Sequence, residues 1–243
     1  MAYYKDLSVL TGENGVKIKP GKLIKSSRVS KYKCKALGLK KIIDLRTPSE
    51  IKLNPDRYTS STVYKNIPMF DMRLTGIEFS KNTILNELND IRTIEEAYIE
   101  MVTNTKYVTN LSKIIKEIIS SEEFPVLYHC TQGKDRTGVT TYVLLSLLGF
   151  DKKTIIDDYL SIKDMNRLKS NLAFLFVLVL KRNLKTAYKI KNFLLAEEKF
   201  IQAAIDAIEE TYGTTDNYIT NALNISEEEI TTFKNKVLEK KNN

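Results

Sequence analysis

Cysteine and histidine are scarce in this sequence. Its 243 residues include two cysteines, Cys34 and Cys130, and a single histidine, His129. Two cysteines cannot build a disulfide framework, and together with one histidine they cannot supply the ligand set of a Cys/His zinc site. We therefore expect a protein that keeps its thiols reduced, which is typical of an intracellular chain.

Long apolar segments are also missing. The opening residues, MAYYKDLSVL, show no basic region followed by an apolar stretch, so no signal peptide is predicted. The longest apolar run is LAFLFVLVL at 172–180, whereas a membrane-spanning helix needs about 20 residues. We expect a cytoplasmic protein with at most a peripheral membrane contact. Export by a route without a cleaved signal is compatible with the same observations.

The charge is dominated by one sign. Lys and Arg together number 38 and Asp and Glu 30, which gives a net charge of +8. This excess suits an anionic partner such as nucleic acid, a lipid headgroup or a phosphorylated substrate, although solubility alone explains it equally well. The hydrophobic share of 42% is that of an ordinary globular chain, long enough to bury one full core.

Strands and helices are predicted to alternate along the chain. The first sixty residues are predicted to hold mainly strands and turns, with a helix ending at Gly38, a buried strand at 41–45 and a new start at Pro48. Another strand is expected at 62–67, helical periodicity at 80–120, a strand at 124–129 and a buried helix at 138–148. Helix signals continue to the end, with a cap at Gly213 and a capping box from Ser226 to Glu229.

This order predicts an α/β fold with a central, mainly parallel sheet of four or five strands and helices on both sides. We expect a single domain, 1–243, with a catalytic α/β core at 1–160 and a helical part at 161–243. The segment 168–195 is apolar first and basic later. It is interpreted as a core helix followed by a surface helix, or as a helical lid over the site, or as a surface that docks on anionic lipid.

One segment departs from this ordinary pattern. Residues 126–149 read VLYHCTQGKDRTGVTTYVLLSLLG, with Cys130 directly after the histidine and Arg136 following after five intervening residues. The loop leaves a predicted strand and opens a predicted helix, whose first N–H groups are unpaired and lie at the positive end of the helix dipole. Gly133 permits a backbone conformation that other residues resist. Such a loop is suited to surround the oxygens of a phosphate group.

The side chains of this loop match the chemistry of phosphate monoester hydrolysis. Arg136 presents a planar fork to two phosphate oxygens, and Cys130 in that cationic setting is expected to react as a thiolate. Thr137 is a candidate donor to the sulfur, whereas His129 is expected to be structural, since a thiolate needs no histidine base. The ordinary alternative is an inert buried cysteine followed by a polar turn. A Walker loop is excluded because it requires glycine at Tyr128.

The segment HCTQGKDRTG closely resembles the signature of cysteine-based protein-tyrosine phosphatases. Its GKDRTG part resembles that of bacterial atypical tyrosine and lipid phosphatases, and the resemblance implies the cysteine-phosphatase fold. GKLIKSSRVS with LGLKKIIDLRTPSE, and later YGTTDNYITNALNISEEEI, are similar to the family's other segments. Two departures concern the N-terminal contacts: YYKDLSV replaces an Asn-Phe-Arg-Asp-Leu-Gly-Gly opening, and Lys25 stands where the family has arginine.

The resemblance also bears on the general acid. In the bacterial branch the aspartate inside the loop is the proposed acid, which favours Asp135. Many related phosphatases instead take an aspartate from a separate loop, and Asp71 is the candidate for that role. Asp44 and Arg46 end a buried strand at the edge where open α/β sheets place their sites. Asp44 is expected to orient the loop, and Arg46 to form a structural salt bridge.

The expected substrate is a phosphorylated protein or a phosphoinositide. Lys134 is either a second cation that binds a further phosphate, as on an inositol ring, or a solvated charge at the rim. Phosphate or sulfate is expected to occupy the loop, and no nucleic-acid partner is expected. No metal or cofactor is expected either, because the arginine and the amides supply the positive field. The substrate-binding group comprises Thr131, Gln132, Gly133, Lys134 and Thr137.

The predicted reaction has two steps, in which Cys130 first takes up the phosphoryl group and water then releases it. An aspartate protonates the leaving oxygen and later activates the water. Two alternatives belong to other classes. One is a catalytically silent phospho-binding module, and the other is a sulfurtransferase or arsenate reductase, which also places a cysteine in an anion-binding loop.

Overall fold

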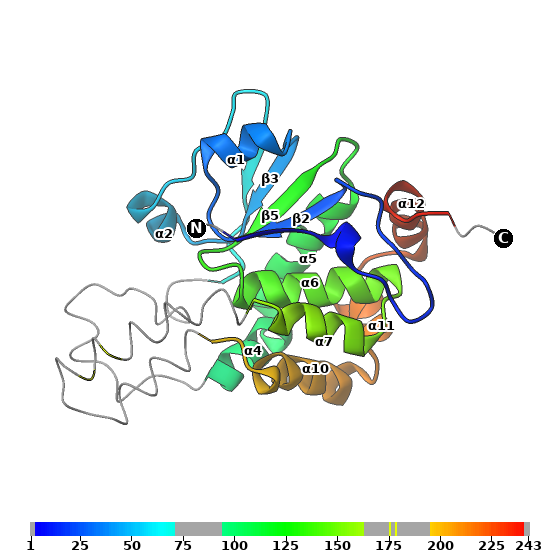
Figure 1. The fold of residues 1–243 in the computed structure, drawn as a ribbon. Coiled ribbons are helices and arrows are strands. Elements are labelled where there is room, and N and C mark those ends of the chain that lie inside the picture. Colours follow the sequence, from blue (N-terminus) through cyan, green and yellow to red (C-terminus); the bar gives the residue numbers. More distant parts are fainter. Residues whose placement is uncertain (1–2, 71–93, 163–174, 176–177, 179–194, 241–243) are drawn as a thin grey trace.

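The protein is organised around one central sheet (Figure 1). The computed structural model describes residues 3–70, 94–162, 175, 178 and 195–240. Within these residues the sheet has five strands in the order β1-β2-β5-β3-β4. The strands are β1 (Tyr4–Asp6), β2 (Leu23–Ser26), β3 (Lys41–Asp44), β4 (Val63–Asn66) and β5 (Val126–His129).

Most strand pairs of the sheet are parallel. β2, β5, β3 and β4 pair in parallel, whereas β1 pairs with β2 in the antiparallel sense at one edge. Ile24, Leu127 and Ile42 stand side by side across the three inner strands and share one apolar cluster. Their chain neighbours Leu23 and Ile43 face the other, larger core, as the alternation of a strand requires. The predicted mainly parallel sheet of four or five strands is confirmed.

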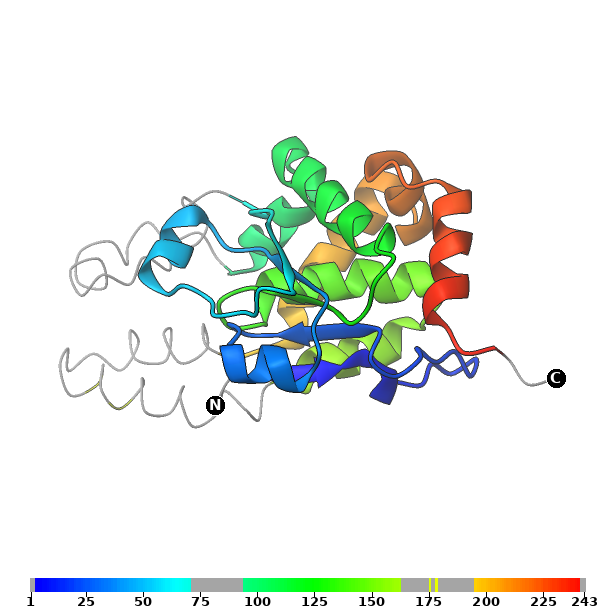
Figure 2. The same cartoon turned by 90° about the horizontal axis from the view of Figure 1, so that it is seen from above.

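Helices cover both faces of this sheet (Figures 1 and 2). α1 (Lys31–Ala36) covers one face, where its Cys34 packs with the first cluster. α5 (Thr105–Ile119), α6 (Asp135–Leu148) and α12 (Glu227–Val237) contribute to the core on the other face. The remaining elements are α2 (Pro48–Leu53), α4 (Ile94–Thr103), α7 (Lys152–Leu160), α10 (Glu198–Tyr212), α11 (Thr215–Asn217), a 3-10 helix at Leu7–Val9 and a π-helical turn at Tyr218–Ala222.

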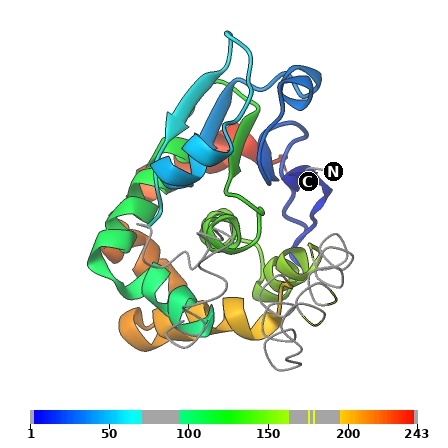
Figure 3. The same cartoon turned by 90° about the vertical axis from the view of Figure 1, so that its left-hand side faces the viewer.

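Helix α6 runs through the middle of the molecule. Figure 3 looks along its axis and shows the sheet, α5, α4, α10 and α7 arranged around it. Nearly all of its side chains are buried, as expected for a helix that is apolar or small on every side. It ends at Gly149, whose φ of 89° provides a left-handed cap. Because β5 leads into it, the start of α6 is fixed at the carboxyl edge of the sheet.

The chain's predicted capping signals lie where the helices begin and end. Ser226 and Glu229 form a capping box at the start of α12, and α10 ends at Gly213. After α12, Leu238 forms an antiparallel bridge with Ile18 of the N-terminal hairpin, and Figure 2 shows these two segments side by side. The last described residues therefore pair with the N-terminal part of the chain.

A buried ion pair links the sheet to α7. Lys25 of β2 and Lys5 of β1 both contact the carboxylate of Asp158, with Nζ–O distances of 2.5 and 2.7 Å. Burial lowers the pKa of Lys25 below its usual value, although the charge and hydrogen bond of Asp158 oppose that shift. Lys25 is thus accommodated by a single carboxylate that it shares with a second lysine.

Several predictions concern residues outside the described part. They include Asp71, the helical segment at 80–93 and nearly all of 168–195, of which the structure describes Leu175, Leu178 and Leu195. Among the helices of the described ranges, none combines the length and the apolar composition needed to cross a membrane. The division into 1–160 and 161–243 stays a prediction, and α10 and α12 share one apolar core with α5 and α6.

Candidate active site

The loop from Cys130 to Lys134 joins the end of β5 to the start of α6. Parallel strands β2, β5 and β3 all end at this edge of the sheet, which is where open α/β sheets bind ligands. Cys130 is 2% exposed, and its Sγ accepts a hydrogen bond from the Gly133 N–H at 3.2 Å. The loop therefore curls around the sulfur and directs a backbone donor at it.

Gly133 has two separate reasons to be glycine. Its φ of +73° lies in the left-handed region that residues with a Cβ rarely adopt. A Cβ at this position would also lie 2.7 Å from the carbonyl oxygen of Ser26, at the end of β2. The glycine thus allows the loop to pass directly over the neighbouring strand, and this contact sets how tightly the loop closes around Cys130.

Arg136, in the first turn of α6, turns its guanidinium inward. The side chain is almost fully buried, and Nη1 and Nη2 donate to the two carboxylate oxygens of Glu50 at 2.6 and 2.7 Å. Nη1 also contacts the carbonyl oxygen of Leu45 at 3.4 Å, and the ring of Phe70 lies 5.0 Å from the guanidinium carbon. The arginine of the loop is therefore clamped in one orientation from the sheet edge.

Glu50 is the partner that the sequence did not assign to Arg136. It is the third residue of α2 and forms a capping box with Thr47, whose backbone N–H donates to Oε2 at 2.9 Å. Thr131 of the loop donates to Oε1. Burial alone raises the pKa of Glu50, but the hydrogen bonds and the charge of Arg136 outweigh it and lower the pKa to about 2. The carboxylate is a permanent negative charge that fixes both the arginine and the loop.

The protein engages only part of the Arg136 guanidinium. A guanidinium carries donors on Nε as well as on both terminal nitrogens. Within the described residues, Glu50 and Leu45 engage Nη1 and Nη2, and no hydrogen bond from Nε is present. The edge formed by Nε and Nη2 thus retains donors in the geometry that fits two oxygens of a phosphate group.

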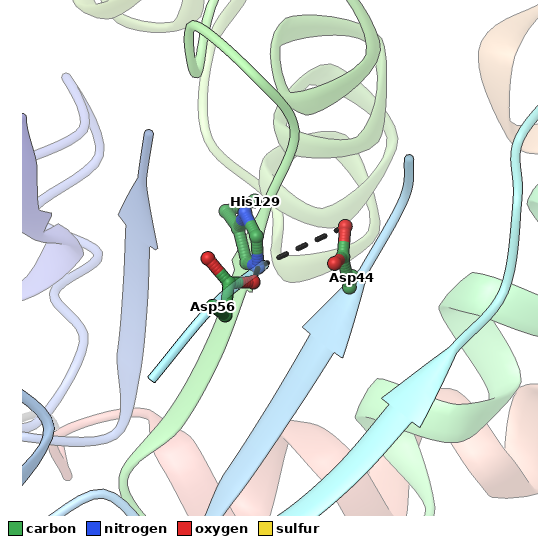
Figure 4. A group of neighbouring side chains, drawn as sticks. All are labelled: Asp44, Asp56 and His129. Atoms are coloured by element: carbon green, nitrogen blue, oxygen red, sulfur yellow. Dashed lines mark ion pairs between the residues drawn. The ribbon is translucent and has the colours of Figure 1, made fainter. Parts of the chain in front are cut away.

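His129, at the end of β5, lies beside Asp44 and Asp56, as Figure 4 shows. Its Nδ1 lies 3.0 Å from the carbonyl oxygen of Cys130, and because a carbonyl can only accept, Nδ1 must carry the hydrogen. Nε2 lies within ion-pair distance of Asp56 (3.0 Å) and Asp44 (3.8 Å), but it makes no aligned hydrogen bond among the described residues. The ring is thus buried and hydrogen-bonded to the Cys130 backbone.

Arg46 binds both of the carboxylates beside this ring. Its guanidinium donates to Asp44 at 2.6 Å and to Asp56 at 2.6 Å, so the predicted structural salt bridge is present. Burial raises the pKa of Asp44, but the hydrogen bonds of Arg46 outweigh it and lower the pKa to about 2. Asp44, Asp56 and His129 offer ligand atoms within 4.8 Å of one another. A cation there would have to compete with a guanidinium that already binds both carboxylates.

Asp135 is the first residue of α6 and is partly buried beside the loop. Its Oδ1 accepts a hydrogen bond from the hydroxyl of Tyr98 at 2.7 Å and lies 3.3 Å from Nζ of Lys134. Lys134 itself is 2% exposed, and its Nζ donates to the carbonyl oxygen of Leu195 at 3.2 Å. The alternative that Lys134 is a solvated charge at the rim is therefore wrong, because residues near α10 cover it.

The other predicted loop residues differ in their surroundings. Thr137 is fully buried, and its Oγ1 has no hydrogen-bond partner among the described residues, so the predicted hydrogen bond to the Cys130 sulfur is not made within them. Gln132 is half-buried at the loop.

Asp71 lies outside the described residues, directly after Phe70 in the sequence. Roles for Asp56, Tyr98 and Tyr159 had no signal in the sequence, because each depends on contacts between distant elements.

Comparisons with known proteins agree with this geometry. A model of the tyrosine phosphatase family matches residues 4–239. The chain is 29% identical over 126 residues to a tyrosine-protein phosphatase of Nostoc commune, and this match spans 51% of the chain and 40% of the relative. It is 24% identical over 241 residues to the triple specificity protein phosphatase PtpB of Mycobacterium tuberculosis, a match that covers 84% of the chain and 87% of that protein.

A third relative gives a similar result. A putative tyrosine-protein phosphatase of Cupriavidus necator is 24% identical over 236 residues, which cover 91% of the chain and 81% of the relative. The names of these relatives all refer to phosphatases, so the alternatives of a silent phospho-binding module and of a sulfurtransferase are not favoured.

Proposed function

Since this chain belongs to the tyrosine phosphatase family, we propose that it hydrolyses phosphotyrosine through a cysteinyl-phosphate formed on Cys130. The chain is a cysteine-based phosphoric monoester hydrolase that acts on a phosphorylated substrate. The observation that carries the proposed mechanism is the closed loop itself. A backbone N–H lies 3.2 Å from the Cys130 sulfur, and Arg136 is clamped by Glu50 in the helical turn that follows.

In the first step the Cys130 thiolate attacks phosphorus, so that an S–P bond forms as the P–O bond to the leaving group breaks. The loop amides and the free edge of Arg136 bind the three equatorial oxygens and stabilise their negative charge. Asp135 delivers a proton to the departing oxygen. The position of Asp135, at the start of the helix that carries Arg136, supports this assignment.

In the second step water attacks phosphorus and the S–P bond breaks, which releases inorganic phosphate and restores the thiolate. The proton lost by the water returns to Asp135. Thr137 is placed in the first turn of α6 with a buried, unpartnered hydroxyl among the described residues. We assign it to the sulfur as it leaves phosphorus, when its negative charge reappears. Phosphate and sulfate are expected to bind the same loop as simple anions.

Phosphotyrosine is the proposed substrate because all three relatives are named as protein phosphatases, and two specifically as tyrosine-protein phosphatases. A phosphoinositide substrate would require Lys134 as a second cation for a further phosphate. That side chain is buried and is engaged by Leu195 and Asp135, so its position supports a second phosphate site less strongly.

The proposal is tested with purified protein and a panel of a phosphotyrosine peptide, a phosphoserine peptide and a phosphoinositide. We expect the phosphotyrosine peptide to have the highest kcat/KM. Cys130→Ser should remove turnover of every substrate while phosphate and vanadate still bind. The matched control is Cys34→Ser at the other buried cysteine, on the opposite face of the sheet, which should keep turnover.

Turnover by Cys130→Ser close to that of the unmodified protein would refute the cysteinyl-phosphate. A phosphoinositide hydrolysed faster than the phosphotyrosine peptide would refute the substrate assignment alone.

A further inference from the structure

Two buried tyrosines form a hydrogen-bonded chain that ends on Asp135. The Tyr98 hydroxyl, from α4, donates to Asp135 Oδ1 at 2.7 Å and lies 2.8 Å from the hydroxyl of Tyr159, from α7. The side chains of both tyrosines are buried, and their rings meet edge to face with centroids 6.3 Å apart. The chain thus joins side chains of α7, α4 and α6, and it ends on one carboxylate oxygen of Asp135.

The direction of this chain follows from the number of hydrogens. A carboxylate oxygen can only accept, so the single hydrogen of the Tyr98 hydroxyl is used on Asp135. Tyr159 must then donate to the oxygen of Tyr98. Burial, followed by the charge of Asp135, raises the pKa of both phenols well above the usual value, so both remain donors at neutral pH. Successive donors polarise one another, which strengthens the last bond, the one to Asp135.

Gly138 of the loop's Arg-Thr-Gly sequence makes room for this arrangement. It lies three residues after Asp135 and therefore on the same face of α6. A Cβ at Gly138 would come within 2.9 Å of Cδ2 and 3.0 Å of Cε2 of Tyr159. Only a residue without a Cβ lets the Tyr159 ring pack this close to α6 while its hydroxyl contacts Tyr98. The glycine and the two tyrosines form one packed unit beside the acid.

The two oxygens of Asp135 consequently have different surroundings. Oδ1 receives the Tyr98 hydroxyl and faces Lys134 Nζ at 3.3 Å, whereas Oδ2 has no hydrogen bond or ion pair among the described residues. An oxygen that accepts from fixed donors acts as the carbonyl of a carboxylic acid. The proton then resides on the other oxygen. The Asp135 side chain is 20% exposed, so a ligand can reach the carboxyl group.

We propose that Tyr98 is a positioning residue for the general acid, and that Tyr159 supports it. Tyr98 holds Oδ1 as the acceptor, so that Oδ2 carries the proton that passes to the leaving oxygen and later takes one from water. The inference rests on the proposed function, because it requires Asp135 to be the acid. It adds a reason why the acid is located at the start of α6, because side chains from α4 and α7 orient the carboxyl group there.

The test uses two aryl phosphates that differ in how much they need an acid. Departure of 4-nitrophenolate needs little protonation, whereas departure of phenolate needs a proton donor. In Tyr98→Phe we expect kcat/KM for phenyl phosphate to fall about tenfold or more, and for 4-nitrophenyl phosphate less than about threefold. The ratio of the two values is measured on one sample, so it does not depend on the folded fraction. Tyr159→Phe should change the ratio in the same direction by less.

A matched control and a second background complete the experiment. Tyr142→Phe removes the hydroxyl of a different buried tyrosine, which lies in α6 and is hydrogen-bonded to Thr215 at 2.6 Å. This substitution should leave the ratio unchanged. In an Asp135→Asn background, Tyr98→Phe should have no further effect on the ratio, because the residue through which it acts is gone.

The outcomes separate the inference from the proposed function. If Asp135→Asn leaves the ratio unchanged, Asp135 is not the acid, and both the acid assignment and the inference fail. If Asp135→Asn changes the ratio but Tyr98→Phe leaves it unchanged, the inference alone is overturned. An equal fall of kcat/KM for both aryl phosphates in Tyr98→Phe is such an outcome. A changed ratio in Tyr98→Phe that persists in the Asp135→Asn background overturns it as well.

Discussion

Glu50 and Asp135 both hold a position beside the loop of Cys130, but their carboxylates are bound in contrasting ways. On the arginine side (Glu50, Thr131 and Arg136), each oxygen of Glu50 accepts from Arg136 and from at least one further donor. On the acid side (Tyr98, Lys134 and Asp135), the contacts gather on Oδ1 of Asp135 alone.

Because of this difference, Glu50 acts as a fixed charge, whereas Asp135 can carry a proton. With both oxygens engaged and a pKa of about 2, Glu50 stays ionised and serves as a rigid counter-charge for the arginine. Asp135 keeps one oxygen without a hydrogen-bond partner among the described residues, which a proton carrier needs. Two carboxylates at one loop thus perform different tasks because the surrounding residues supply different numbers of donors.

The comparison predicts the largest effect for Arg136→Lys. A lysine has one ammonium group and cannot pair with both oxygens of Glu50 while presenting two donors to phosphate. We expect kcat/KM for 4-nitrophenyl phosphate to fall about 10²- to 10³-fold, as when a fixed donor to a transition-state oxyanion is lost. Steady-state kinetics measure it, with Arg28→Lys at an exposed arginine as the control. A loss below about fivefold would contradict the role of the planar fork.

Glu50→Gln should have an intermediate effect with a different signature. Glutamine keeps the shape but loses the charge and one acceptor, so Arg136 loses a charge-assisted hydrogen bond and its fixed orientation. We expect kcat/KM to fall about 10- to 100-fold, the equivalent of one such bond. The loss should be equal for phenyl and 4-nitrophenyl phosphate, because the arginine side binds the phosphoryl group common to both. A loss confined to phenyl phosphate would place Glu50 in proton transfer and erase the distinction between the two sides.

The arginine side and the acid side also show which parts of the site can be predicted from the sequence. Cys130, Gly133 and Arg136 were predicted because their roles depend on spacing within one strand-loop-helix unit. The mainly parallel sheet and the capping box of α12 were predictable for the same local reason, from periodicity and turn chemistry. In each case the physical cause lies within a few residues of its effect.

The partners of the loop were not predictable in this way. Glu50 is 86 residues from Arg136, and Tyr98 is 37 residues from Asp135, so only the folded chain brings them together. Lys134 was expected either as a cation for substrate or as a charge at the rim. It is buried because Leu195 and Phe200 lie over it, and no local pattern places those residues there.

The smallest predicted effect concerns stability rather than turnover. Glu50 has a pKa of about 2 in the fold, below its ordinary value of 4.5, so the folded state binds a proton there less readily than the unfolded state. Its contribution is therefore fully present above about pH 5 and is lost as the pH falls towards 2. The shift corresponds to roughly 3 kcal/mol in the free energy of unfolding.

Urea unfolding between pH 7 and pH 2.5 tests this for the unmodified protein, Glu50→Gln and Thr131→Val. Glu50→Gln removes the titrating group, so its free energy of unfolding should change less over this range than that of the unmodified protein. Thr131→Val removes a smaller cause of the shift than Arg136 and should retain most of the pH dependence. Parallel curves for the unmodified protein and Glu50→Gln would mean that Glu50 is not held as a permanent charge. The arginine side would then carry a labile proton like the acid side.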